Sequence, residues 1–258
     1  MTKRNFKSFK YKDSNFRICC NVPDIVEKAV ISLRNELEHY IESNPEFKTS
    51  LVPVDFDADA PESARRMMSA SEKFGVGPMA AVAGTIAQMA CEESLKHGAD
   101  EVIIDNGGDC YFSLKKDMTA AVFAANSPVS GRIAFRFTEK FYNTGVCSSS
   151  SKMGHSLSLG RCDLVTIFSK NNSIADAAAT SFCNCIKCDD DISDVLKKAE
   201  EMEDIEGIFI IMNEKIAMAK SVPEIIKINS DLLTDKIVFD SKSPDASLIL
   251  DFYHNKKN

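Results

Sequence analysis

The chain has 258 residues, of which 44% are hydrophobic and 27% charged, and these proportions are typical of a globular protein rather than a disordered or fibrous one. This length allows a sizeable buried core, and we expect residues 1–258 to form a single domain. The formal net charge of −7 is spread along the chain, which argues against a nucleic-acid partner, and the absence of a run of about 18 apolar residues argues against a membrane span.

Nine cysteines are a high number for this length. Their count is odd, and no apolar run typical of a secretory signal follows the first residues, so we expect reduced thiols in a cytoplasmic protein. Ten Met, nine Cys and no Trp also indicate an anaerobic source, because thiols and thioethers are sensitive to oxidation.

The first part of the chain predicts a hairpin and a long helix. Two β-rich runs, residues 6–10 and 16–21, flank a turn at residues 13–15. Apolar residues then recur at helical spacing from Val26 to Ile41, with Asp24 as the expected N-cap and an end near Asn44.

Two further helices are expected after an acidic loop at residues 53–61. The first covers residues 62–74. The second covers residues 79–95 and follows Pro78, which stands where a proline commonly begins a helix. The second helix is almost wholly apolar and small, so other backbone can approach it closely. We therefore expect it to be central.

The remaining sequence alternates irregularly between strand and helix patterns. Strands are expected at residues 101–105, 117–125, 132–137, 164–168 and 207–212, and helices at 174–186 and 192–202. Residues 220–258 give no clear pattern. This irregular order predicts an α+β protein rather than a doubly wound sheet.

The segment Asn106-Gly107-Gly108-Asp109 follows one predicted strand. Its glycines allow a sharp turn and a close approach of backbone to a ligand. Asn-Gly is also a strong signal of a β-hairpin turn. On these residues alone the hairpin turn is the better interpretation.

A second candidate segment is rich in serine. Hydroxyls and unpaired backbone N–H groups are expected to be dense at residues 144–151 and 154–160, and such loops bind phosphate or carboxylate. His155 lies between Gly and Ser, where it can donate to an anion or move a proton. A polar connection between two strands explains the segment equally well.

Asp176 and Thr180 form a third candidate, because a separation of four residues places both on one face of a helix. A carboxylate and a hydroxyl in this arrangement suit a hard cation such as Mg²⁺. An exposed aspartate, or one that caps the first turn of its own helix, is the better interpretation without further context.

Cys183, Cys185 and Cys188 form a fourth cluster. Strong metal motifs need four ligands or paired motifs, and helical spacing scatters these thiols over different faces. We expect inert thiols that bind no metal, with a redox or persulfide role as the alternative.

Taken in order, these motifs resemble the ApbE flavin-transferase superfamily. A Gly-Gly-Asp turn follows a strand, a Ser-rich segment leads to His155, and Ala175-Asp176-Ala177 is followed by Thr180. Residues 77–84, 106–109, 147–149 and 154–160 look still more like uncharacterised protein family 0280. The resemblance spans about residues 75–184 and implies an ApbE-like layered fold with mixed or antiparallel sheets and packed helices. It also implies a motif-bearing core at about 75–185, with residues 190–258 in the same unit.

The resemblance implies roles for particular residues. In ApbE proteins, Mg²⁺ bound by the Asp and Thr of the third motif holds the diphosphate of FAD, which is hydrolysed or gives FMN to a protein threonine. Asp176 and Thr180 would then be metal ligands, and His155 would approach phosphate. The expected cofactor-binding residues are Asn106, Gly107, Gly108, Asp109, Ser148 and Ser149.

The sequence also departs from the transferases. They carry a Lys-Gly step and an Asp soon after it, where this chain has Ala83-Gly84 and neither the Lys nor the Asp. Residues 156–160 replace their Asp-Pro-x-Thr-Gly. We therefore expect a phosphorylated ligand, such as FAD or FMN, bound with Mg²⁺, and the altered motifs argue against flavin transfer itself.

Two other functions fit the same residues. One is a protein of sulfur assimilation or homocysteine formation, with Cys147 as its reactive thiol. An anion-binding loop around Cys147 would lower the pKa of the thiol. The other is a non-catalytic binding subunit, and association of the chain with itself is compatible with either.

Overall fold

The computed structural model describes residues 4–124, 127–151, 160–228 and 248–250. The larger sheet contains β1 (Lys7–Tyr11), β2 (Ser14–Cys19), β3 (Val102–Asn106), β4 (Asp109–Ser113), β7 (Asn143–Ser149), β8 (Leu164–Ser169), β9 (Gly207–Met212) and β10 (Lys215–Lys220). The smaller sheet contains β5 (Met118–Val122), β6 (Ile133–Phe137), β11 (Glu224–Lys227) and β12 (Leu248–Leu250). The helices are α1 (Pro23–Ser43), α2 (Pro45–Thr49), α3 (Glu62–Phe74), α4 (Val82–Lys96), α5 (Asn172–Cys185) and α6 (Asp191–Glu201), with 3₁₀ turns η1 (Pro78–Ala81) and η2 (Glu139–Phe141).

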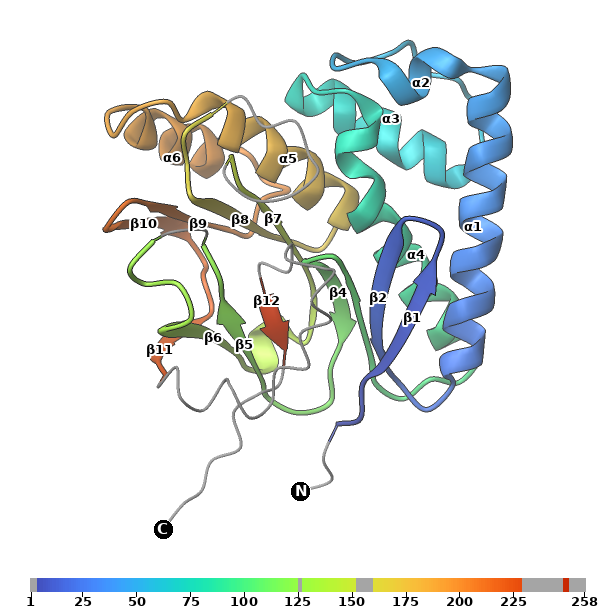
Figure 1. The fold of residues 1–258 in the computed structure, drawn as a ribbon, viewed down its shortest axis with the longest axis horizontal. Coiled ribbons are helices and arrows are strands. Elements are labelled where there is room, and N and C mark those ends of the chain that lie inside the picture. Colours follow the sequence, from blue (N-terminus) through green and yellow to red (C-terminus); the bar gives the residue numbers. More distant parts are fainter. Residues whose placement is uncertain (1–3, 125–126, 152–159, 229–247, 251–258) are drawn as a thin grey trace.

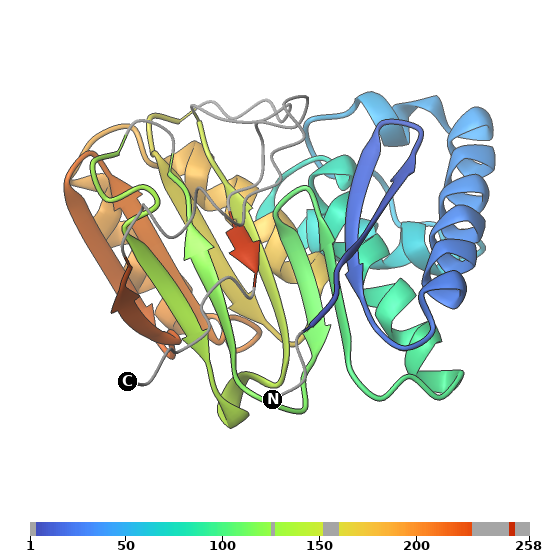
Figure 2. The same cartoon turned by 60° about the horizontal axis from the view of Figure 1, so that its bottom comes forward.

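The two sheets and the helices form layers. The larger sheet has the order β1-β2-β3-β4-β7-β8-β9-β10 and the smaller one β11-β6-β5-β12. Neighbouring strands pair antiparallel in both sheets. The helices cover one face of the larger sheet, with α1 and α4 beside β1–β4 and α5 and α6 over β7–β10 (Figure 1). Figure 2 shows the smaller sheet on the opposite face. The expected α+β architecture is confirmed.

The N-terminal elements agree with the sequence except at two boundaries. The β1–β2 turn consists of Lys12 and Asp13, with Lys12 at φ +53°, so it lies one residue before the expected turn. Helix α1 begins at Pro23 after Val22, and no side chain caps it. The expectation that Asp24 is the N-cap is therefore wrong, because proline already fixes the first turn. Asp24 lies within that turn, where its charge favours the helix dipole.

The small-residue helix is central, as expected. It begins with the 3₁₀ turn η1 and continues as α4. Ile86, Ala87 and Ala90 are fully buried between α1 and strands β2 and β3. Helix α3 ends at Gly75, whose φ of +66° forms a left-handed C-terminal cap.

Strand β7 corrects the loop expected at residues 144–151. Strand β7 pairs with β4 on one side and β8 on the other, so it is an interior strand of the larger sheet. The expectation of unpaired backbone N–H groups at residues 144–149 is therefore wrong. Its small polar residues have low strand propensity, but burial between two neighbouring strands outweighs this preference.

An aromatic cluster joins the two sheets. The ring of Phe135 in β6 makes edge-to-face contacts with Phe168 and Phe209 of the larger sheet, at centroid distances of 5.2 Å and 5.0 Å. Phe112 and Phe137 form another such pair at 4.9 Å. These rings fill the space between the sheets and fix their separation.

No single helix in the described residues is both long and apolar enough to cross a membrane. One pair, Glu62–Phe74 with Pro78–Lys96, reaches the length together, but a bend of 105° separates its halves.

Replacement of Phe135 by Ala should lower the free energy of unfolding by about 3–5 kcal/mol, because it empties a buried aromatic site that cannot collapse fully. Urea denaturation measures this change. Phe56→Ala is the control, since that ring is 53% exposed and its loss should cost within about 0.5 kcal/mol. Equal losses for the two variants would contradict the assignment of Phe135 to the core.

Candidate functional site

Three side chains that can ligate a metal converge beneath the helical layer. Asp109 begins β4, Cys147 lies in β7, and Asp176 lies in α5 above that strand. One potential ligand atom from each lies within 4.8 Å of the other two. Cys147 and Asp176 are buried, and Asp109 is partly exposed. Two of the predicted site carboxylates are therefore brought together.

The position of Asp109 is set by the hairpin between β3 and β4. Asn106 and Asp109 are paired across a two-residue turn, and its glycines, Gly107 and Gly108, have φ values of +68° and +105°. Glycine reaches such angles without steric cost, so the hairpin interpretation of this segment is confirmed. The amide of Asn106 donates to the Ala83 carbonyl at 3.2 Å and ties the turn to α4.

The reverse face of the turn is also fixed. Gly108 N–H donates to Asp105 at 2.8 Å, and the Asp105 carboxylate forms an ion pair with Arg17 at 2.6 Å. These contacts hold the turn from the side away from the helices. Asp109, the first residue of β4, is consequently held in one orientation.

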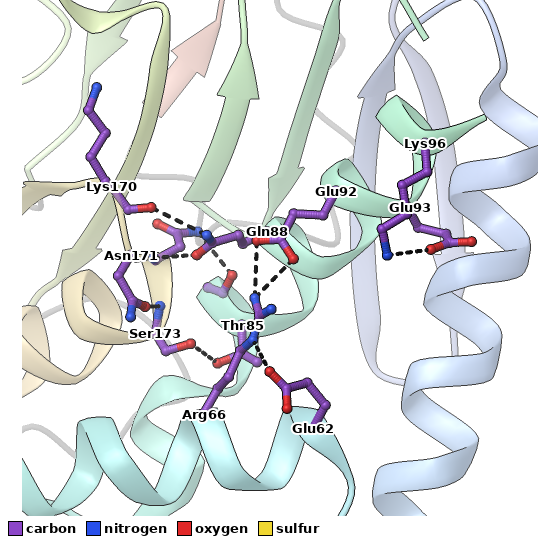
Figure 3. A network of polar contacts seen from close by, with 12 residues as sticks. Glu62, Arg66, Thr85, Gln88, Glu92, Glu93, Lys96, Lys170, Asn171 and Ser173 are labelled. Carbon is purple, nitrogen blue, oxygen red and sulfur yellow. Dashed lines mark hydrogen bonds and ion pairs between the residues drawn. The ribbon is translucent and has the colours of Figure 1, made fainter. Parts of the chain in front are cut away.

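The start of α5 is locked to α4 by polar contacts (Figure 3). The Asn171 side chain caps α5 by accepting from Ser173 N–H at 3.1 Å. Thr85 and Ser173 are joined by a hydroxyl hydrogen bond of 2.7 Å. Gln88 donates to the Lys170 carbonyl at 3.3 Å and accepts from Asn172 N–H at 2.6 Å. Asp176 is one turn farther along this anchored helix.

Two glycines let α4, α5 and β7 meet around Asn172. A Cβ on Gly145 would lie 2.1 Å from Asn172 Oδ1, and one on Gly84 would lie 2.5 Å from the Asn172 carbonyl oxygen. The Asn172 amide fills this space and donates to the Gly84 carbonyl at 3.0 Å. The sequence interpretation missed Asn172, Gly145 and Gln88. Two consecutive asparagines before an apolar helix were an available signal of a helix start.

The carboxylate of Asp176 caps a neighbouring helix. Its Oδ2 accepts from Gly84 N–H at 2.8 Å, in the first turn of α4, where backbone donors have no partner within the helix. Asp176 is only 8% exposed, so it is neither an exposed aspartate nor the cap of its own helix, and those alternatives are wrong. Thr180 lies four residues farther along α5 and is partly exposed.

Burial and neighbouring negative charge raise the pKa values of both carboxylates. Burial, with a contribution from the charge of Asp105, raises the pKa of Asp109 to about 7, although Ser148 N–H and the Cys147 thiol oppose the shift. Burial and then the charge of Asp109 raise the pKa of Asp176 well above its ordinary value. Within the described residues neither carboxylate forms an ion pair. A buried carboxylate without a counter-charge retains a proton or recruits a cation.

Cys147 is not an activated thiol in this environment. Burial, followed by the charges of Asp109 and Asp176, raises its pKa well above the ordinary value. Its Sγ lies 3.1 Å from Asn172 Oδ1, to which the thiol donates. The expectation that an anion-binding loop lowers this pKa is wrong, because Cys147 lies in a paired strand beside two carboxylates. A free, reactive thiolate at Cys147 is therefore not supported.

The other expected residues are placed as follows. Ser148 donates through its backbone N–H to Asp109 at 3.1 Å, while its hydroxyl bonds to Thr166 at 2.9 Å. Ser149 is buried, and His155 lies outside the described residues. Cys183 is buried, whereas Cys185 and Cys188 are exposed. That these three thiols bind no metal stays a prediction.

Two surface hollows lie apart from this site. Arg66 contributes to both, and its guanidinium pairs with Glu62 at 2.9 Å and with Glu92 at 3.1 Å (Figure 3). The hollows have volumes of about 460 Å³ and about 420 Å³. Neither is lined by Asp109, Cys147 or Asp176.

In metal-free protein, stability should fall as the pH rises from about 4 to about 7. The folded state keeps a proton on Asp109 up to about pH 7, whereas the unfolded chain loses it near pH 4, so folding binds protons in this window. Asp109→Asn removes that titration and should flatten the decline. A pKa moved from 3.8 to about 7 corresponds to at most about 4 kcal/mol, and solvent screening reduces this figure.

Urea denaturation in a chelator across this pH range measures the effect. Asp191→Asn is a control whose own titration lies below this range, so it should leave the decline between pH 4 and pH 7 in place. Backbone N–H groups of Lys187 and Cys188 lower the pKa of Asp191, so its contribution is present above pH 4 and lost as the pH falls. An unchanged decline in Asp109→Asn would show that Asp109 ionises normally in the folded protein.

Comparisons with known proteins agree on one family. A family model described as AbpE bacteria matches residues 5–218. A UPF0280 protein of Methanocaldococcus jannaschii is 44% identical over 206 residues, which cover 78% of this chain and 83% of the relative. A UPF0280 protein of Methanopyrus kandleri is 40% identical over 207 residues, with the same coverage of 78% and 83%.

Solved structures share the fold at low identity. The apo form of the flavinyl transferase ApbE from Pseudomonas stutzeri has a TM-score of 0.55 and 9% identity, with 90% of this chain and 97% of that chain covered. The ApbE protein from Thermotoga maritima has a TM-score of 0.55 and 12% identity, with 84% and 97% covered. These similarities establish an ApbE fold, and the matches in sequence show that the chain belongs to the ApbE-like UPF0280 family.

Proposed function

We propose that the protein binds a phosphorylated small molecule, with a flavin nucleotide as the first candidate, through a divalent cation held by Asp176. Asp176 is buried and Asp109 is partly exposed, and this adjacent pair of carboxylates, which lacks a counter-ion among the described residues, carries the proposal. Burial of two adjacent carboxylates is costly unless a cation or a proton compensates for their charge. The flavin is proposed from the ApbE fold, which this chain has in common with the flavinyl transferase ApbE of Pseudomonas stutzeri.

The donor set suits Mg²⁺ in its chemistry. Mg²⁺ takes oxygen ligands from one or two carboxylates, together with substrate phosphates and water. Gly84 N–H engages Asp176 Oδ2, and Thr180 follows one helical turn later. Bound there, Mg²⁺ would polarise phosphoryl oxygens and offset their charge.

The chain's own residues would hold the geometry. Ser148 N–H orients the Asp109 carboxylate, and the first turn of α4 orients that of Asp176. These backbone donors come from rigid elements, so little reorganisation accompanies binding. The α4 donors to Asp176 are occupied, and a phosphate would therefore reach this site through the cation rather than through the helix N-terminus.

The proposal covers binding and not flavin transfer. The position that resembles the transferases' Lys-Gly step is Ala83-Gly84, so the ammonium group that they carry there is absent. Hydrolysis of a bound diphosphate needs only an oriented water and a polarised phosphoryl group, and it is the reaction that we propose to test first.

Asp176→Asn should reduce Mg²⁺-dependent binding of FAD or FMN at least about 10-fold, because even the loss of a residue that only orients a metal ligand costs about 10–100-fold. Asparagine is preferable to alanine, because its Oδ1 can still accept from Gly84 N–H and preserve the cap of α4. Thr180→Val keeps the shape and should weaken binding less. Calorimetry with and without Mg²⁺ measures the affinities, and thermal melts monitor the fold.

Asp189→Asn serves as the matched control, because that aspartate lies on the exposed surface before α6. It should leave the affinity unchanged. Equal affinity in wild type and Asp176→Asn would end the metal hypothesis. Absence of binding for FAD, FMN and the corresponding adenine nucleotides in wild type would end the ligand hypothesis.

A further inference from the structure

We infer that Cys147 is a ligand of the same cation site, and that the site of Asp109, Cys147 and Asp176 takes a thiophilic divalent metal of the Zn²⁺ or Fe²⁺ class. The inference rests on the proposal that Asp176 holds a divalent cation. It departs from that proposal in naming a thiolate ligand and hence another preferred metal.

The geometry is close to that of a three-ligand metal site. Potential ligand atoms of the three side chains all lie within 4.8 Å of one another. Ligands at 2.0–2.3 Å in a tetrahedral site are about 3.5 Å apart, so distances of up to 4.8 Å need to shorten by at most about 1.3 Å. Each ligand comes from a different element, β4, β7 or α5, and these elements are packed together. Three protein ligands leave a fourth position for water or substrate, as in catalytic zinc sites.

The surroundings of Asp176 are a second reason to expect a cation at this site. Asp176 is 8% exposed, and its described hydrogen-bond donors are backbone N–H groups of Gly84 and Ala83. No lysine, arginine or histidine in the described residues forms an ion pair with it.

The sulfur of Cys147 also has space around it. A Cβ on Gly84 would approach Cys147 Sγ to 3.0 Å. Glycine at this position therefore keeps the sulfur free of crowding.

Without a metal the Cys147 thiol is protonated. It donates to Asn172 Oδ1 at 3.1 Å, lies 3.7 Å from the Asn172 carbonyl oxygen, and is within hydrogen-bond reach of Asp109. On metal binding the S–H bond breaks, a sulfur–metal bond forms, and the proton leaves to solvent. No electron is transferred, so the step needs no oxidant or reductant. Asn172 loses one donor but keeps its own hydrogen bond to Gly84.

Ligand softness determines which metal this set prefers. Thiolate is a soft ligand that selects Zn²⁺ and related ions, whereas Mg²⁺ prefers oxygen. Zn²⁺ should therefore displace Co²⁺ from the site, and a large excess of Mg²⁺ should not. Zn²⁺ should also bind to the three ligands more tightly than it would to the two carboxylates alone.

Co²⁺ tests the thiolate directly, because a cobalt–thiolate bond gives a near-ultraviolet charge-transfer band that oxygen ligands do not give. The experiment uses chelator-treated full-length protein carrying Cys185→Ser and Cys188→Ser, which removes the exposed thiols. We expect a band that saturates at one Co²⁺ per chain. Added Cys147→Ser should abolish the band and release one proton fewer on binding. Added Cys162→Ser, which alters another buried thiol, should keep it.

Asp109→Asn provides a second variant that leaves the sulfur in place. It should weaken Co²⁺ binding at least about 10-fold and retain the band at saturation. Absence of the band in the parent protein, or its persistence after Cys147→Ser, would overturn the inference. A band without nucleotide binding would overturn the proposed function alone, and Mg²⁺-dependent nucleotide binding without a band would overturn the thiolate ligand alone.

Discussion

The hydrogen bond between Asp176 and the first turn of α4 is the contact on which the arrangement of the site depends. It brings a carboxylate of α5 under the N-terminus of another helix, where unpaired N–H groups and the helix dipole favour negative charge. This stabilisation is incomplete, since burial and the nearby Asp109 still raise the pKa of Asp176. The fold therefore holds two carboxylates that ionise less readily than ordinary ones. Carboxylates with such perturbed pKa values are often found at functional sites.

Close packing around Asn172 makes that contact possible. The helices α4 and α5 approach each other and β7 so closely that glycine is required at Gly84 and Gly145. The Asn172 side chain occupies the resulting space and bonds to both α4 and Cys147. Backbone and side-chain polar groups are thus satisfied in an interior where an unsatisfied one would be costly. A displacement of α5 would separate Asp176 from Asp109 and Cys147 together.

The sequence predicts the parts of this site that depend on local chemistry. The hairpin at Gly107–Gly108, helix α3 and the small-residue helix α4 follow from turn residues, caps and apolar spacing. The pairing of Asp109 with Asp176 was expected only from the resemblance, since no local pattern relates residues so far apart. Strand β7 was missed because its small polar residues resemble a loop, and only its two neighbouring strands make it a strand. The error in the expected pKa of Cys147 has the same origin, because a thiol's environment is set by tertiary packing.

The departure from the transferase motif and the charge of the site are connected. A lysine in place of Ala83 would add a positive charge in the first turn of α4, whose N–H groups meet Asp176. With alanine there, the described residues supply backbone dipoles but no full positive charge to the two carboxylates. Dipoles alone leave both pKa values raised, so the missing charge must come from bound protons or from a metal. A thiol that is otherwise hard to ionise lies at the same point, so a thiophilic metal would gain a third ligand there that Mg²⁺ does not favour. The alanine at position 83 and the thiol of Cys147 are therefore the two features on which the proposed metal site depends.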